Sequence, residues 1–378
     1  MRASTAELRN ANLLAVYKYI YEQKEATKTE ISYALRLSLP TVTQDLNELL
    51  SSSRILSTQK TEASVGRPAM LYQFNSNHHV AFGVEVLQKK VYVATVDLYG
   101  HIIKEAKLEL QFENTPEYFK AIGDFINDFI DAQGYPDGDI LGVTFAVQGI
   151  VSEDDEHMTF STLLNTSDFT RANFAQHFRH KVSLVHDTEA AAIAEDWYVR
   201  GSDLNAIYLS LNHNLGSARI IGGKVVHTDN LSSGTIEHMT LYPRGKTCYC
   251  GKKGCVDCYV SAEALMEAAG MTVPEFFEAK KAGDKKVLKV WNQYLSDLAL
   301  VIENSRMVID GCVILGGLLD EYITDEDIDK LKKNIRSISC FPQVEPVIIH
   351  SHYGSKATII GSAITEISVY LQRIGLDV

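Results

Sequence analysis

The chain has 378 residues and 46% of them are hydrophobic, which is enough for two or three domains with sizeable cores and excludes bulk disorder. The formal net charge of −12 by itself argues against nucleic-acid binding. No run of about 18 apolar residues is present, and the first residues lack a signal-peptide core, so we expect a cytoplasmic protein with no membrane segment.

The charge is divided unevenly along the chain. Residues 1–76 hold nine Lys and Arg against seven Asp and Glu, a net of +2, and the remainder carries −14. A slightly basic head on an acidic body is typical of a small DNA-binding module attached to a larger domain. We therefore expect a first domain over residues 1–76.

Three short helices are predicted in the first 52 residues. The first runs roughly over Thr5–Gln23. The second opens at Thr27, and Glu30 follows at the capping-box spacing, in which each side chain satisfies a backbone donor. The third begins at the N-cap Ser38 and has Pro40 in its first turn, where a missing N–H costs little.

The third helix has one apolar and one polar side. Val42, Leu46 and Leu49 point inward on this pattern. The polar side carries short hydrogen-bonding side chains suited to base edges and phosphates in a major groove, namely Thr41, Thr43, Gln44 and Asn47.

Two strand-like stretches, at 55–56 and 71–74, predict a β-wing after the helices. The segment between them contains Gly66-Arg67-Pro68. We expect Arg67, on an arm restricted by proline, to probe a minor groove, with an ordinary turn arginine as the alternative. A winged helix-turn-helix is thus predicted, and the alternative is a helical protein-interaction domain.

The pattern after residue 77 predicts two α/β lobes, 77–200 and 201–378, with a cleft between them. Each lobe has three leading strand-like segments followed by helices. The leading segments are Phe82–Val86, Val91–Asp97 and His101–Leu110 in the first lobe, and Ala206–Ser210, Ser217–Ile221 and Lys224–Val226 in the second.

Four of the six cysteines fall within eleven residues, which in a cytoplasmic chain indicates a metal site rather than disulfides. Cys248, Cys250 and Cys255 are spaced as thiolate ligands of a structural, tetrahedral Zn²⁺. His238 is the natural fourth ligand, and Cys258 is the rival.

These motifs together resemble the ROK family of repressors, open reading frames and sugar kinases, on its regulator branch. The resemblance covers essentially the whole chain. It rests on the winged head, His238 with the cysteine motif, the stretch Asp187–Glu195, Leu315-Gly316-Gly317 and Ile360–Ala363. It implies an actin-like ATPase fold, a homodimer or homotetramer, and an operator-binding protein switched by a sugar or sugar derivative.

The turns that would hold ATP depart from the family pattern. Kinase members need glycine-rich turns so that backbone N–H groups can approach phosphate. Here the first turn, 84–90, has no glycine, and the second, 212–216, has one, Gly216. Asp187 stands where the family has its general base. We therefore expect no phosphoryl transfer and no enzyme activity.

The expected sugar site is altered as well. His186 stands in place of an asparagine, Thr235 in place of a glutamate, and Asp257 in place of another glutamate, whereas Asp187 and His238 persist. Each lost charge-assisted hydrogen bond should weaken hexose binding by about 1.5–3 kcal/mol. The effector is thus either an unusual small molecule or absent. The expected effector-facing residues are His186, Asp187, Glu237, His238 and Asp257.

The resulting prediction is a regulator, a repressor of carbohydrate-related genes, that binds double-stranded DNA at an inverted repeat. Two other functions remain open. An ATP-dependent sugar kinase would consume ATP with a sugar panel. A zinc-stabilised sensor or scaffold would show no salt-dependent DNA affinity.

Overall fold

The computed structural model describes residues 5–59, 69–152, 154, 156–161, 164, 169–200, 202–227 and 234–376. The chain forms two units. The head comprises Met1–Val80, Asp97–Tyr99 and Val369–Asp377, and the body comprises Ala81–Val96 and Gly100–Ser368 with Val378.

The head contains three helices and a three-stranded antiparallel sheet of order β1-β3-β2. Its elements are α1 (Thr5–Gln23), β1 (Glu25–Thr27), α2 (Lys28–Leu35), α3 (Leu39–Ser51), β2 (Ile55–Gln59) and β3 (Met70–Phe74). The three helices and the hairpin predicted from the sequence are confirmed. The sequence did not predict β1, because a three-residue strand is too short to show alternation.

The helix ends of the head follow from local side-chain chemistry. The Thr27 hydroxyl accepts from Glu30 N at 3.3 Å, while the Glu30 carboxylate accepts from Thr27 N at 2.7 Å, so the predicted capping box is present. Arg36 ends α2 in the left-handed region, with φ 54°, and Ser38 caps α3 through Thr41 N. These caps fix the tight turn between α2 and α3.

The body begins with a five-stranded sheet of order β11-β7-β4-β5-β6. The strands are β4 (Val80–Val86), β5 (Lys90–Asp97), β6 (Ile102–Glu109), β7 (Ile140–Val147) and β11 (Val182–His186). Helices α4 (Pro116–Asp131) and α5 (Arg171–Ala175) accompany it, as does a small unpredicted sheet of β8 (Ile150–Val151), β9 (His157–Phe160) and β10 (Phe169–Thr170).

The second sheet of the body has the order β13-β12-β14-β15. Its strands are β12 (Ala206–Leu211), β13 (Leu215–Ile220), β14 (Cys312–Gly316) and β15 (Ile348–His350). The third leading strand predicted at Lys224–Val226 is wrong. Gly222 and Gly223, with φ of 59° and 68°, turn the chain back, and Val225 makes only an isolated bridge to Ile220.

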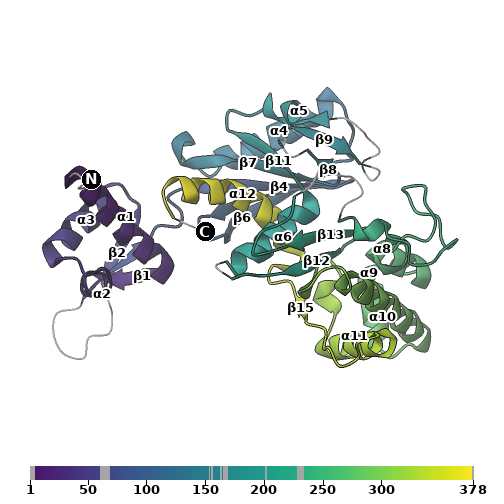
Figure 1. Ribbon diagram of the computed structural model, residues 1–378. Coiled ribbons are helices and arrows are strands. Elements are labelled where there is room, and N and C mark those ends of the chain that lie inside the picture. The colour runs from purple at the N-terminus through teal and green to yellow at the C-terminus, as the bar shows by residue number, and fades with distance from the viewer. Residues whose placement is uncertain are drawn as a thin grey trace. The chain divides into compact units, whose positions relative to one another are not determined.

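Two helices, α6 (Asp187–Tyr198) and α12 (Ala357–Arg373), run between the two sheets (Figure 1). Glycines permit this close packing. A Cβ on Gly83 of β4 would lie 1.9 Å from the Ile359 carbonyl oxygen, and a Cβ on Gly361 of α12 would lie 1.7 Å from the Ala190 carbonyl oxygen. Helix α12 is therefore packed closely against both β4 and the start of α6.

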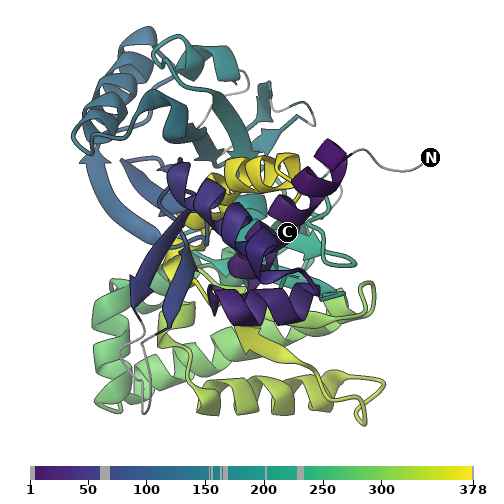
Figure 2. The same cartoon turned by 90° about the vertical axis from the view of Figure 1, so that its left-hand side faces the viewer.

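The remaining helices pack beside the second sheet, around a core that includes Trp291, Leu298 and Phe276 (Figures 1 and 2). They are α7 (Asp257–Val260), α8 (Ala262–Ala269), α9 (Val273–Lys281), α10 (Lys285–Arg306) and α11 (Asp325–Ile338). Among the described residues, no helix has both the length and the apolar character needed to cross a membrane.

Candidate functional site

The predicted metal ligands converge on one point of the body. One ligand atom from each of His238, Cys248, Cys250 and Cys255 lies within 4.8 Å of all the others. The Cys248 Sγ is 3.8 Å from His238 Nδ1, and the Cys250 Sγ is 3.7 Å from the Cys255 Sγ. A tetrahedral ion with metal–sulfur bonds of about 2.3 Å requires sulfurs about 3.8 Å apart, so the group fits such an ion.

The segment from Cys248 to Cys255, called the metal loop below, brings its sulfurs together through the conformation of its backbone. Gly251 and Gly254 have φ of 85° and 79°, and a Cβ on Gly254 would lie 1.8 Å from the Tyr242 carbonyl oxygen. The Cys248 N–H donates to the Lys252 carbonyl at 2.8 Å. The glycines therefore allow the chain reversal that brings the three sulfurs together.

Cys258 does not belong to the group of mutually close ligand atoms. Its thiol is half-buried and lies outside that group. Of the two fourth ligands that the sequence left open, the geometry favours His238.

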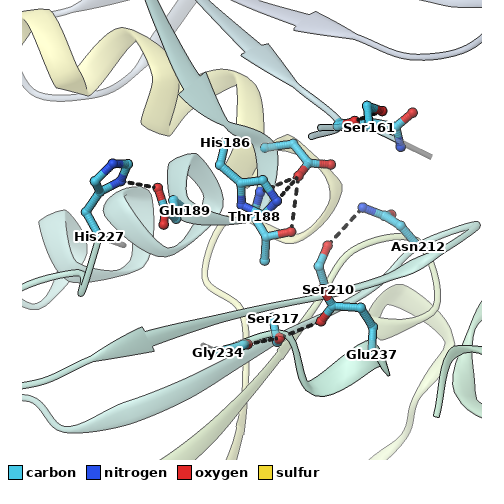
Figure 3. Close-up of polar contacts among 12 residues, drawn as sticks. Ser161, His186, Thr188, Glu189, Ser210, Asn212, Ser217, His227, Gly234 and Glu237 are labelled. Atoms are coloured by element: carbon cyan, nitrogen blue, oxygen red, sulfur yellow. Dashed lines mark hydrogen bonds and ion pairs between the residues drawn. The ribbon is translucent and has the colours of Figure 1, made fainter. Parts of the chain in front are cut away.

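A second polar cluster lies at the start of α6 (Figure 3). His186 Nε2 lies 3.3 Å from Asp187 Oδ1, and the same oxygen accepts from Thr188 N at 2.8 Å. Both His186 and Asp187 are partly exposed, with 23% and 22% of their side chains accessible. They can therefore meet a ligand without leaving their partners.

Glu237 lies on a 3₁₀ turn, Ile236–His238, that ends ten residues before Cys248, and the charges of His186 and Asp187 both act on it. Burial raises the pKa of Glu237 to about 7, and the charge of Asp187 adds to that increase while His186 opposes it. The Ser217 hydroxyl lies 2.7 Å from Glu237 Oε2 and 2.7 Å from the Gly234 carbonyl. One hydroxyl proton cannot serve both acceptors, so this geometry suits a protonated Glu237.

Asp257 is placed differently from the other predicted effector residues. It is buried, and its Oδ1 accepts from Leu215 N at 2.7 Å. Burial raises its pKa to about 6. Tyr249 is 39% exposed, and its ring packs edge-on against the His238 ring with 5.3 Å between the ring centroids. His238 itself is turned toward the cysteines.

Two carboxyl groups, one on β4 and one on α6, were not predicted as site residues from the sequence. Burial raises the pKa of Glu85, at the end of β4, to about 8, and the Asp187 charge contributes. Glu195 of α6 is buried and accepts from the Ser351 hydroxyl and from His352 N at 3.0 Å. A single acidic residue in the otherwise apolar strand β4 was the signal that could have identified Glu85.

In the head, the polar side of α3 separates into two kinds of residue. Gln44 and Asn47 are exposed. Thr43 donates its hydroxyl to the Leu39 carbonyl at 2.6 Å, and the Thr41 hydroxyl shares a hydrogen bond with Ser38. Arg67 lies outside the described residues.

A family model for the ROK family matches residues 81–367. The chain belongs to the ROK family. The xylose repressor of Bacillus subtilis (strain 168) is 24% identical over 265 residues, covering 69% of this chain and 68% of the repressor. The DNA-binding transcriptional repressor Mlc of Escherichia coli (strain K12) is 23% identical over 271 residues, covering 70% and 66%.

Two solved structures extend the likeness in fold. A ROK family transcriptional regulator, described as a homolog of Escherichia coli Mlc, has a TM-score of 0.73 at 20% identity and covers 98% of each chain. A ROK family glucokinase from Streptomyces griseus has a TM-score of 0.66 at 21% identity, covering 76% of this chain and 98% of the kinase. The ROK body thus has the predicted actin-like fold.

In this ROK protein, glycines of the 212–216 turn and of the Leu315-Gly316-Gly317 segment lie close to neighbouring side chains. A Cβ on Gly216 would lie 2.1 Å from the Thr188 Oγ1. A Cβ on Gly316 would lie 2.2 Å from the Tyr208 hydroxyl, and one on Gly317 would lie 2.9 Å from the Asn212 Oδ1. Protein atoms therefore occupy the space beside these backbones.

Proposed function

We propose that this ROK protein is a DNA-binding transcriptional regulator that represses genes of carbohydrate metabolism. The observation that carries the proposal is the exposed pair Gln44 and Asn47 on α3, in a head with the element order of a winged helix-turn-helix. Amide side chains at such positions recognise adenine in a major groove. Relatives named as repressors support the same function.

The operator we propose is an inverted repeat bound by a homodimer or homotetramer, because a two-fold oligomer presents two recognition helices one or more DNA turns apart. Thr41 and Thr43 contribute smaller contacts than the amide pair, and Arg67 adds a minor-groove contact. The proposed head spans residues 1–76, and the two proposed lobes span residues 77–200 and 201–378. The proposed location is the cytoplasm.

In this proposal the metal is a structural Zn²⁺. Three thiolates and one imidazole are a typical zinc donor set, and four protein ligands leave no open position for a reacting water. His238, Cys248, Cys250 and Cys255 would hold the ion and so fix the loop that carries Tyr249.

The effector in this proposal is a small hydroxylated molecule that contacts His186, Asp187 and Glu237. Asp257 and His238 support the effector-contacting residues and do not contact the effector themselves, because Asp257 is bound to Leu215 N and His238 belongs to the metal group. Phosphoryl transfer is not part of the proposed function, because the turn at 84–90 has no glycine that would let phosphate approach its backbone N–H groups. An ATP-consumption assay with a sugar panel should give no turnover, and turnover would establish a kinase instead.

The first test is fluorescence anisotropy of the purified protein with DNA from its own upstream region and with random DNA, at two salt concentrations. Asn47→Ala and Gln44→Ala should each weaken selective binding by about 1–3 kcal/mol and leave random-DNA binding unchanged. Thr43→Ala should have a smaller effect, since its hydroxyl proton is bonded to Leu39. The exposed Gln23 of α1 provides the control, Gln23→Ala. Equal, weak binding of both DNAs would contradict the proposal and favour a sensor or scaffold.

A further inference from the structure

The start of α3 carries a leucine that the fold leaves partly in solvent. Leu39, the first residue of this helix, is 47% exposed. The buried apolar residues of the same helix are at most 1% exposed, namely Val42, Leu46 and Leu49. Nearly half of Leu39 therefore remains available to a partner outside the head.

Leu39 shares one side of α3 with the exposed amide side chains. Residues four apart lie above one another on a helix, so Leu39, Thr43 and Asn47 form one row. Gln44 borders this row, three residues before Asn47. Thr43 donates its hydroxyl to the Leu39 carbonyl at 2.6 Å, so this proton is not offered to a partner. The exposed side of α3 is thus apolar at its N-terminal end and carries its amide groups further along.

Leu39 also borders a surface hollow of about 650 Å³ formed by α2, the turn after it and the start of α3. Tyr33, which is 88% exposed, and Arg36 line the same hollow. None of the residues that line it is acidic. The hollow therefore combines an aromatic ring, an aliphatic side chain and a cation, a composition that suits the edge of a base beside a phosphate.

The carboxyl groups of α2 and α3 are buried or bound to donors. Asp45 is 2% exposed, and Glu48 binds Arg9 at 2.7 Å. Glu30 accepts from Thr27 N at 2.7 Å in the capping box. These two helices, all of whose residues the structure describes, thus present no exposed carboxylate without a donor. Such a surface is compatible with double-stranded DNA, which carries one negative charge for about every 1.7 Å of its length.

On the basis of the proposed DNA-binding function, we propose that Leu39 recognises thymine through the C5 methyl group that this base presents in the major groove. A recognition helix contacts base edges with its N-terminal residues, and Leu39 is the first residue of α3. Apolar side chains contact the thymine methyl group, whereas the amides of Gln44 and Asn47 suit adenine. Leu39 thus distinguishes thymine from cytosine at one position of each half-site.

The test uses the full-length protein and the upstream DNA that it binds selectively, with single thymidines replaced by deoxyuridine. Deoxyuridine lacks the C5 methyl group and keeps the same base pairing. Fluorescence anisotropy should show that wild type binds about fourfold more weakly for each contacted methyl group that is removed, as expected for one buried methyl. Leu39→Ala should bind the unsubstituted DNA more weakly by a similar factor, and deoxyuridine at the same position should have no further effect.

Two further variants serve as controls. Leu39→Met keeps an apolar side chain of similar volume and should keep the sensitivity to deoxyuridine. Leu8→Ala removes another exposed leucine of the head, on α1, and should behave as wild type.

Equal affinity of wild type for thymine and uracil at every position would overturn the inference, as would an undiminished deoxyuridine effect in Leu39→Ala. Random DNA in the same assay separates the two possible failures. Equal binding of random and unsubstituted upstream DNA contradicts the proposed function itself. Selective binding without any effect of deoxyuridine contradicts only the role of Leu39.

Discussion

Glu237 and His238 are neighbours in the chain but belong to regions built in different ways. His238 shares a single centre with three cysteines, so each ligand depends on the other three. The carboxyl groups nearby are held one at a time, Glu237 by Ser217 and Asp257 by Leu215 N. Loss of one metal ligand should therefore weaken metal binding by the whole group. Loss of Glu237 or Asp257, called the carboxyl cluster below, should remove only the contacts of that one residue.

The largest effect should come from removing a shared ligand. Cys255→Ser should lower zinc affinity by more than about 100-fold, because loss of an outer partner alone costs 10–100-fold. Competition with a chelator of known affinity measures this, and Cys312→Ser is the control because Cys312 is also a half-buried cysteine but lies outside the metal group. Unchanged affinity in Cys255→Ser would show that the four ligands do not share one ion.

Substitution in the carboxyl cluster should have a local, pH-dependent effect. The folded protein keeps the Glu237 proton up to a pKa of about 7, whereas the unfolded chain releases it near the ordinary value of 4.5. The folded state thus binds more protons between these values, and the free energy of unfolding falls as the pH rises through this window.

Glu237→Gln removes that decrease. Relative to wild type, the variant should gain about 2–3 kcal/mol between pH 5 and pH 8, measured by urea unfolding at both pH values. Glu278→Gln, at an exposed glutamate of α9, should show no such change. Parallel pH profiles for wild type and Glu237→Gln would mean that Glu237 is not protonated in the folded protein.

The sequence predicted these two regions unequally for a physical reason. Cysteines at a short, glycine-interrupted spacing indicate a metal site, so a ligand set could be predicted from the pattern, and the structure brings His238 rather than Cys258 into the same group as the three cysteines. The partners of a carboxyl group are set by tertiary packing, which spacing does not encode. Glu85 and Glu195 were therefore not predicted as site residues, although the sheets and helices around them were predicted.

The same limit applies in the head. A 3.6-residue period identified the polar side of α3, but it could not tell that Thr43 bonds its own backbone while Asn47 is left exposed. The small sheet β8–β10 was also missed, because strands of two to four residues give no periodic signal.

The smallest effect should come from the close approach of Thr188 in α6 to Gly216 in β13. Gly216→Ala forces a Cβ against Thr188 and should cost about 1–2 kcal/mol of folding free energy. Thr188→Ala in the same chain should restore most of that loss. Gly138→Ala, where the added Cβ meets open space, is the control. If the double variant were as destabilised as Gly216→Ala alone, the loss of folding free energy would not come from the contact with Thr188.

The contact between Gly83 and the Ile359 carbonyl also bears on biosynthesis. The body's first strand, β4, packs against α12, which leaves the ribosome after every other helix and strand described. For most of translation the part of the first sheet that α12 covers is therefore exposed, a typical condition for chaperone binding. A transcript truncated before residue 357 should yield a product that is degraded rather than one that retains half of the function.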